Sequence, residues 1–277
     1  MSLVLMYITN NPQVAMIAEK YGVNRIWIDL ETLGKEERQK GMNTVKSKHS
    51  VEDIKQIKPL LTSSELLVRV NPWNINSHHE IDEVIAAGAD LVMLPMWKSI
   101  SEVEEFVSAV NKRCKTVLLL ETKQAVECLD YVLELGGIDE IHIGLNDLHL
   151  SYGMDFMFEP LSCGLIDEIA MKIANAKIPY GFGGIASLGS GDLPAEKIIM
   201  EHYRLGSSRA ILSRSFCNTD IISKIEDVEA VFCTNMQALR KFELRVGNMS
   251  TAEFETNRIE VKNAVNKIIE NKRNQCR

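Results

Sequence analysis

The sequence lacks the cysteine patterns of a disulfide-rich or zinc-binding protein. Its 277 residues contain six cysteines, which are scattered along the chain. There is no Cys-x-x-Cys pair and no cluster of cysteine and histidine at zinc spacing. We therefore expect reduced thiols and no structural zinc.

Long apolar runs and an excess of basic residues are also missing. No run approaches the roughly 20 apolar residues that a membrane span needs. The opening MSLVLMYITNNPQ has neither the basic region nor the small-residue cleavage site of a secretory signal. Lys and Arg number 31 against 38 Asp and Glu, a net charge of −7, which argues against a nucleic-acid partner. We expect a cytoplasmic protein with neither a membrane nor a nucleic acid as its partner.

The chain instead alternates apolar runs of strand length with segments of helical period. Its hydrophobic content of 45% is enough for one large core. The expected strands cover residues 3–8, 25–30, 66–71, 90–96, 116–121, 140–145, 180–185 and 209–214. Eight such repeats predict an α/β fold, a (β/α)8 TIM barrel over residues 1–218, with an open doubly wound sheet as the alternative.

Residues 219–277 follow as a helical extension that has no strand to cover. Phe254, Val261, Val265 and Ile268 form a stripe of nearly heptad spacing within it. An apolar stripe of this kind packs on its own barrel or on a neighbouring subunit. We therefore expect a homo-oligomer.

Polar side chains gather where the expected strands end. In a TIM barrel these carboxyl ends surround the active site. The residues concerned are Asp29, Glu31, Arg69, Asn71, Glu121, Asn146, Asp147, Ser213 and Arg214. Each one alone could equally be an ordinary strand-end residue that caps a helix or pairs with a neighbour.

Glu121 is the most informative of these residues, because it ends the apolar run Val117–Leu120. A carboxylate at the end of a buried strand must be paired, hydrogen-bonded or bound to a cation. Asp147 ends the next repeat, so the two acids are expected on adjacent strands. Two carboxylates with water completing the shell suit Mg²⁺ or Mn²⁺, and we predict a divalent-metal site at Glu121 and Asp147.

Arg69 lies at the end of the third strand. A guanidinium there can hold a carboxylate or an enolate oxygen, and with the metal it would surround a small-molecule 2-oxo acid substrate. The plainer interpretation of Arg69 is an ion pair with Asp29 or Glu31. Both roles can hold at once.

Two segments carry a family resemblance. GADLVMLPM and LLLETKQAVECLDYVLELGGIDEIHIGLNDL resemble the HpcH/HpaI aldolase and citrate lyase beta-subunit family, within the phosphoenolpyruvate/pyruvate barrel superfamily. The resemblance covers nearly all of residues 3–216 and is most specific across 115–153.

The resemblance implies a (β/α)8 barrel whose divalent metal is held by Glu121 and Asp147, with Arg69 binding a pyruvate unit. The I-G-x-N-D-L form favours the branch of class II pyruvate aldolases. These enzymes cleave or form a 4-hydroxy-2-oxo acid through a pyruvate enolate. The resemblance also places Gly184 in a backbone wall of the substrate pocket. Asn71 is expected either to line the site or to shape its loop.

One departure from the family pattern concerns proton transfer. The aldolases carry D-x-E-H after the second strand, whereas residues 29–32 here read Asp-Leu-Glu-Thr. Because a threonine is a poor base, another group or a metal-bound water must serve. The nearest histidine by sequence is His49, which is otherwise an exposed loop residue. The expected catalytic residues are Arg69, His49, Glu31 and Asp29.

His142 and His149 flank the strand that leads to Asp147. The alternation of His142 with Ile141 and Ile143 predicts that it faces a strand–helix interface or supports another residue. His149 follows Asp147 closely enough to reach the barrel mouth.

Two other functions remain open at this stage. One is a coenzyme A thioester lyase like the citrate lyase relatives, which needs a basic entrance for the nucleotide. The other is a metal-binding barrel without catalysis, since the family histidine is replaced by Thr32.

Overall fold

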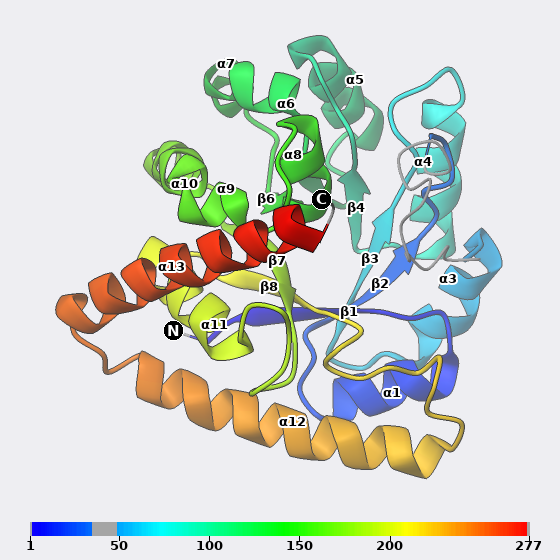
Figure 1. Ribbon diagram of the computed structural model, residues 1–277. Coiled ribbons are helices and arrows are strands. Elements are labelled where there is room, and N and C mark those ends of the chain that lie inside the picture. The colour runs from blue at the N-terminus through cyan, green and yellow to red at the C-terminus, as the bar shows by residue number, and fades with distance from the viewer. Residues whose placement is uncertain (1, 35–48, 276–277) are drawn as a thin grey trace.

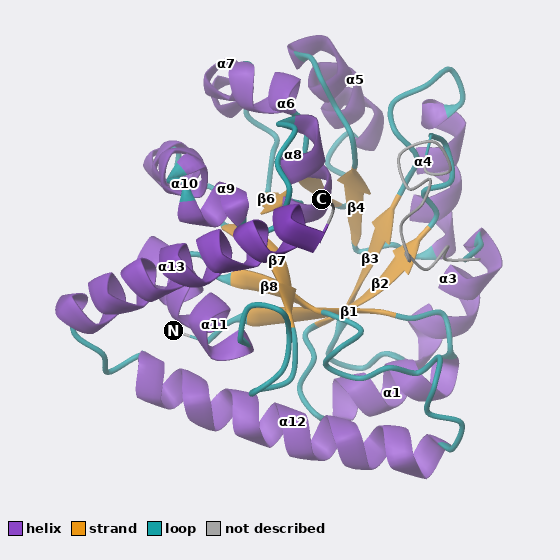
Figure 2. Cartoon of the chain, in the orientation of Figure 1, coloured by secondary structure: helices purple, strands orange, loops and turns teal. Residues whose placement is uncertain are grey.

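The computed structural model describes residues 2–34 and 49–275, and eight parallel strands form its centre (Figures 1 and 2). In chain order they are β1 (Val4–Ile8), β2 (Arg25–Asp29), β3 (Glu65–Arg69), β4 (Leu91–Leu94), β5 (Lys115–Leu120), β6 (Glu140–Ile143), β7 (Tyr180–Ile185) and β8 (Arg209–Leu212). Each pairs with the next, and β8 pairs with β1, so the barrel is closed. The predicted TIM barrel and all eight strands are confirmed, which excludes the open sheet.

Helices surround the barrel (Figure 2). They are α1 (Pro12–Lys20), α3 (Val51–Ile57), α4 (Ser77–Ala87), α5 (Ile100–Val110), α6 (Lys123–Glu127), α7 (Leu129–Glu134), α8 (Leu145–Ser151), α9 (Glu159–Ser162), α10 (Leu165–Asn175) and α11 (Ala195–Leu205), with a 3₁₀ turn at Lys58–Leu60. Most of the apolar core lies between these helices and the strands. A smaller cluster, which includes Met6, Leu67 and Leu119, fills the barrel interior.

The C-terminal extension consists of two long helices, α12 (Ile225–Val246) and α13 (Thr251–Gln275). α12 packs on α1 and α11, and α13 packs on α11 and α9. Val261 and Val265 of the predicted stripe are buried, while Phe254 and Ile268 are partly buried against the same core. The extension thus packs on its own barrel, and a homo-oligomer stays a prediction. No helix in the described ranges is both long and apolar enough to cross a membrane.

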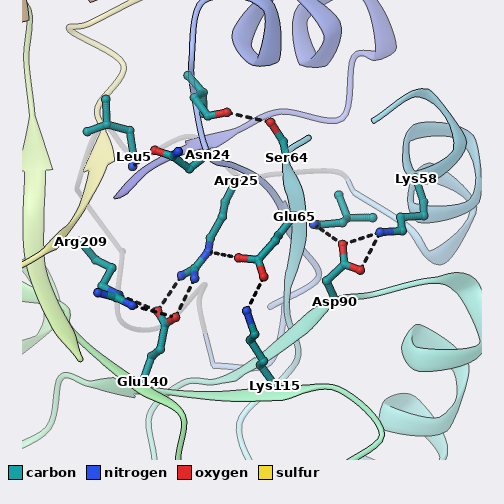
Figure 3. A network of polar contacts seen from close by, with 12 residues as sticks. Leu5, Asn24, Arg25, Lys58, Ser64, Glu65, Asp90, Lys115, Glu140 and Arg209 are labelled. Atoms are coloured by element: carbon teal, nitrogen blue, oxygen red, sulfur yellow. Dashed lines mark hydrogen bonds and ion pairs between the residues drawn. The ribbon is translucent and has the colours of Figure 1, made fainter. Parts of the chain in front are cut away.

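A network of ion pairs closes the amino-terminal end of the barrel (Figure 3). Its five members are the first residues of their strands: Arg25, Glu65, Lys115, Glu140 and Arg209. Arg25 donates two hydrogen bonds of 2.6 Å to Glu140 and one of 2.9 Å to Glu65. Arg209 also donates to Glu140, at 3.0 Å, and Lys115 pairs with Glu65. The amino-terminal end of the barrel is therefore occupied by paired charges.

Candidate active site at the carboxyl ends of the strands

A cavity of about 690 Å³ opens at the carboxyl ends of the strands. The residues that line it come from β1, β2, β3, β5, β6, β7 and β8 or from the loops that follow these strands. Among the residues expected from the sequence, those that line it are Asp29, His49, Arg69, Glu121, Asn146, Asp147, Gly184, Ser213 and Arg214. The closed barrel brings these side chains together although they are spread over more than 150 positions of the chain.

Glu121 follows β5 directly and is buried, with 3% of its surface exposed. The backbone N–H of Met96 donates to its Oε1 at 3.1 Å. Gly144, which follows β6, leaves room for the other oxygen, because a Cβ built there would lie 2.6 Å from Oε2. The N–H of Met96 and the absence of a side chain at Gly144 therefore determine where this carboxylate lies.

The surroundings of Glu121 disfavour its negative charge. Burial, and then the negative charge of Asp147, raise the pKa of Glu121 well above its ordinary value. The positive charge of Arg69 lowers this pKa, but by less than burial and Asp147 raise it. Asp147 lies in the first turn of α8 and is half-buried. A divalent cation between the two carboxylates would remove their repulsion.

The donor set suits a hard cation. Within residues 2–34 and 49–275, no group of three or more His, Cys, Asp or Glu side chains is arranged to hold a metal. Zn²⁺ usually takes three or four protein ligands, whereas Mg²⁺ is usually held by one or two carboxylates with water and substrate oxygens. Two carboxylates, with water and substrate oxygens, are a donor set that Mg²⁺ or Mn²⁺ accepts.

Arg69 is fixed by two acids from β2 and the residues after it. Its Nε and Nη2 donate to the two oxygens of Asp29 at 2.8 and 2.9 Å, and Nη1 lies 3.1 Å from Glu31 Oε2. Its guanidinium also lies 5.5 Å above the centre of the Trp27 ring. The ion pair expected as the plainer role is present. Since a guanidinium has five N–H groups and these contacts use three, Arg69 can still bind a substrate oxygen.

Two of the expected site residues do not line the cavity. Asn71 accepts hydrogen bonds from the backbone N–H groups of Thr32 and Leu33, at 2.8 and 3.0 Å, and donates to Glu80. It shapes the loop after β2, the second of its two expected roles, and its placement as a substrate-binding residue is not supported. Glu31 is 2% exposed and acts through its ion pair with Arg69.

The histidines differ from the expectation in an instructive way. His142 lines the cavity, so the first of its two expected places, a strand–helix interface, is wrong, while the second, support of another residue, stays a prediction. In a barrel the helix-facing positions take the apolar residues, here Ile141 and Ile143, and the polar alternates face inward. His149 is 7% exposed, with its Nδ1 3.3 Å from the Leu145 carbonyl, and it is not among the cavity residues.

Sequence reasoning assigned no role to Gly144 or Trp27. The sequence feature that could have identified Gly144 is its position directly after β6, because β6 pairs with β5 and Glu121 directly follows β5. The signal for Trp27 was its alternation with Arg25 and Asp29, which puts all three on the inward face of β2.

Gly144→Ala tests how Glu121 is placed. Its backbone φ of −82° suits alanine, but the added Cβ would press on the Glu121 carboxylate. We expect the affinity for Mn²⁺, measured by calorimetry, to fall by about 10–100-fold while the protein stays folded. Gly247→Ala, where a Cβ meets nothing closer than 3.4 Å, is the matched control. If Gly144→Ala bound Mn²⁺ as tightly as the parent protein, the missing side chain at Gly144 would not be what places Glu121.

Solved structures share the architecture. The HpcH/HpaI aldolase from Desulfitobacterium hafniense is 13% identical, with a TM-score of 0.60 over 87% of this chain and 93% of that chain. An HpcH/HpaI aldolase/citrate lyase family protein from Burkholderia cenocepacia is 13% identical, with a TM-score of 0.60 over 87% and 94%. The citrate synthase SbnG is 16% identical, with a TM-score of 0.59 over 86% and 94%. At these identities the likeness establishes the fold.

The family is established by sequence. A comparison with curated proteins finds no match. The family model of HpcH/HpaI aldolase/citrate lyase matches residues 3–157, more than half of the chain, and this stretch includes β1 to β6 and both Glu121 and Asp147. The chain therefore belongs to the HpcH/HpaI aldolase/citrate lyase family.

Proposed function

We propose that this protein is a divalent-metal-dependent carbon–carbon lyase of the class II pyruvate aldolase type. Its substrate is a 4-hydroxy-2-oxo acid, which it cleaves or forms through a pyruvate enolate. Membership of the family supports a lyase. The observation that carries the finer assignment is the pair of acids, Glu121 and Asp147, at a cavity that Arg69 also lines.

Each side chain has a role in this proposal. Glu121 and Asp147 would hold the cation, which supplies Lewis-acid polarisation of the 2-oxo group when bound. Arg69 donates hydrogen bonds to the substrate carboxylate or to the oxygen that gains charge as the enolate forms. Asp29 and Glu31 orient the guanidinium from behind. Gly184 forms part of the backbone wall of the cavity.

The reaction is balanced without a further reactant. In the cleavage direction the proton of the 4-hydroxyl group passes to a base, the C3–C4 bond breaks, and the aldehyde leaves. The electron pair of that bond remains on the three-carbon fragment as pyruvate enolate, which is then protonated at C3. Arg69 stabilises the charge that the enolate oxygen carries during this step.

His49 is a poor candidate for the base while its observed contact holds. The backbone N–H of Asp29 donates to His49 Nδ1 at 3.0 Å. The lone pair of the ring is therefore occupied, and the neutral ring carries its proton on Nε2. His49 can orient a substrate oxygen but takes up a proton only if this bond breaks.

His49→Asn tests that conclusion, since the asparagine carbonyl can accept the same Asp29 hydrogen bond. We expect kcat for retro-aldol cleavage to fall by about tenfold or less. Loss of a general base typically costs 10²–10⁴-fold. A loss of about 10³-fold, with unchanged metal affinity, would identify His49 as the base after all.

The function itself is tested by following product release, with Mg²⁺ present, from a panel of 4-hydroxy-2-oxo acids and from coenzyme A thioesters of hydroxy acids. The proposal predicts pyruvate from at least one member of the first group and no cleavage of the second. Cleavage of thioesters alone would identify a thioester lyase. Metal binding without cleavage of either group would identify a non-catalytic barrel.

A further inference from the structure

The cavity reaches below the level of the two acids, down to His142 and Trp27. Both side chains line it, together with the glycines at 144, 183 and 184. Gly144 lies two residues beyond His142, on the same inward face, and it places no side chain above His142. The barrel mouth is therefore open on this side to a floor formed by His142 and Trp27.

The floor carries two polar groups that have no partner. His142 is 4% exposed and Trp27 is 3% exposed. Their Nδ1 and Nε1 atoms are buried without a hydrogen-bond partner among the described residues. The two rings meet edge to face, with their centres 6.3 Å apart. Because buried polar atoms are nearly always paired in folded proteins, two orphans beside one cavity indicate a ligand that supplies the partners.

The chemistry of the floor selects a neutral hydroxyl group. Trp27 offers a donor, and His142 offers a donor or an acceptor according to its tautomer. Burial, with the nearby charges of Arg25 and Arg69, lowers the pKa of His142 to about 4 despite the opposing effect of Glu140, so the ring is uncharged at neutral pH. The walls around it are apolar, with Ile8, Leu119 and Ile211. A cation here would lose its hydration and be repelled by Arg25 and Arg69, and an anion would find both guanidinium groups already paired with acids.

The depth of the floor indicates which part of the substrate reaches it. His142 pairs in register with Leu119, and Glu121 lies two residues beyond Leu119, directly after β5. Residues two apart on a strand are separated by about 7 Å, so the floor is one layer below the acids. In a 2-oxo acid whose carboxylate and 2-oxo oxygens bind at Glu121, Asp147 and Arg69, C3 is the first carbon without such an oxygen and the first that can carry a further substituent.

We propose that His142 and Trp27 form a binding subsite for a hydroxyl group on C3 of the 2-oxo acid. This inference rests on the proposed function, and it extends the substrate class to 2-oxo acids that also carry a hydroxyl group on C3, whose cleavage would release 3-hydroxypyruvate in place of pyruvate.

Two ligands of nearly equal shape test the subsite. 3-Hydroxypyruvate carries a hydroxyl group on C3 where 2-oxobutyrate carries a methyl group. We expect the parent protein with Mg²⁺ to bind 3-hydroxypyruvate at least about tenfold more tightly in calorimetry. His142→Phe and Trp27→Phe should each bring the two affinities within about threefold. Trp97→Phe is the matched control, because Trp97 Nε1 is also buried and unpaired but lies outside this cavity, and it should keep the preference.

The outcomes separate this inference from the function on which it rests. If pyruvate and 2-oxobutyrate bind but 3-hydroxypyruvate has no advantage, the floor holds only water and the subsite is overturned. A preference that survives in both folded variants would overturn it as well, with folding checked by circular dichroism. If none of the three acids binds in the presence of Mg²⁺, it is the proposed function that fails.

Discussion

Glu121→Gln is expected to lower the affinity for Mn²⁺ by more than about 100-fold. Replacing a group that merely supports a metal ligand costs about 10–100-fold, so removing a charged ligand should cost more. If the cation contributes several kcal/mol to stabilising the enolate, turnover should fall by about 10³-fold. Calorimetry measures the first effect, and pyruvate release from a 4-hydroxy-2-oxo acid measures the second.

The same variant separates binding from folding. Glutamine keeps the shape of Glu121 and removes one of two acids that repel each other, so the metal-free variant should unfold at no lower temperature than the parent. Added Mn²⁺ should raise the unfolding temperature of the parent but not that of the variant. Glu80→Gln, which changes an acid outside the cavity, is the control and should respond as the parent does. A normal Mn²⁺ response in Glu121→Gln would remove this residue from the metal site.

Glu140→Gln is expected to destabilise the protein by about 3 kcal/mol. Glu140 is 5% exposed and accepts hydrogen bonds from Arg25 and Arg209, so the variant leaves buried guanidinium charge without its main counter-charge. Urea denaturation measures the change in the free energy of unfolding. Glu229→Gln, which changes an exposed partner of Lys20, is the matched control and should alter stability little.

The pH dependence of stability provides a second measure of the same network. Burial alone would raise the pKa of Glu140, but the hydrogen bonds and charges of Arg25 and Arg209 lower it to about 2. A carboxylate whose pKa is lower in the folded than in the unfolded protein stabilises the fold. This stabilisation is fully present above the pKa of the unfolded state, about 4.5, and is lost as pH falls toward 2. Parental protein should therefore lose stability over this range more steeply than Glu140→Gln. Parallel curves for the two proteins would contradict the assignment.

The fold was predictable because strand length and inward alternation are local properties of the sequence. Every expected strand is present, within a few residues of its predicted bounds. His142 shows where local reasoning failed. Its alternation with two isoleucines was recognised, but one of the two places that it predicted was a strand–helix interface, whereas closure of the barrel turns His142 inward.

The site was predictable where strand ends alone determine position. Asp29, Arg69, Glu121 and Asp147 meet at one cavity because parallel strands bring their carboxyl ends to the same edge. The sequence did not decide between the two expected roles of Asn71, since its amide bonds to the backbone of a loop whose course only the structure shows. The role of His49 was not decided by the sequence either, because the sequence does not show which of its ring nitrogens accepts the hydrogen bond from the Asp29 N–H.

Solvent exchange into pyruvate tests the central claim, that Glu121 and Asp147 hold a divalent cation at a site that forms a pyruvate enolate. Pyruvate is incubated with the protein and Mg²⁺ in D₂O, and loss of the methyl proton signal is followed by NMR. The account predicts exchange that requires both protein and metal, stops when the metal is chelated, and disappears in Glu121→Gln. No exchange by the parent protein, with Mg²⁺ shown to be bound, would contradict it.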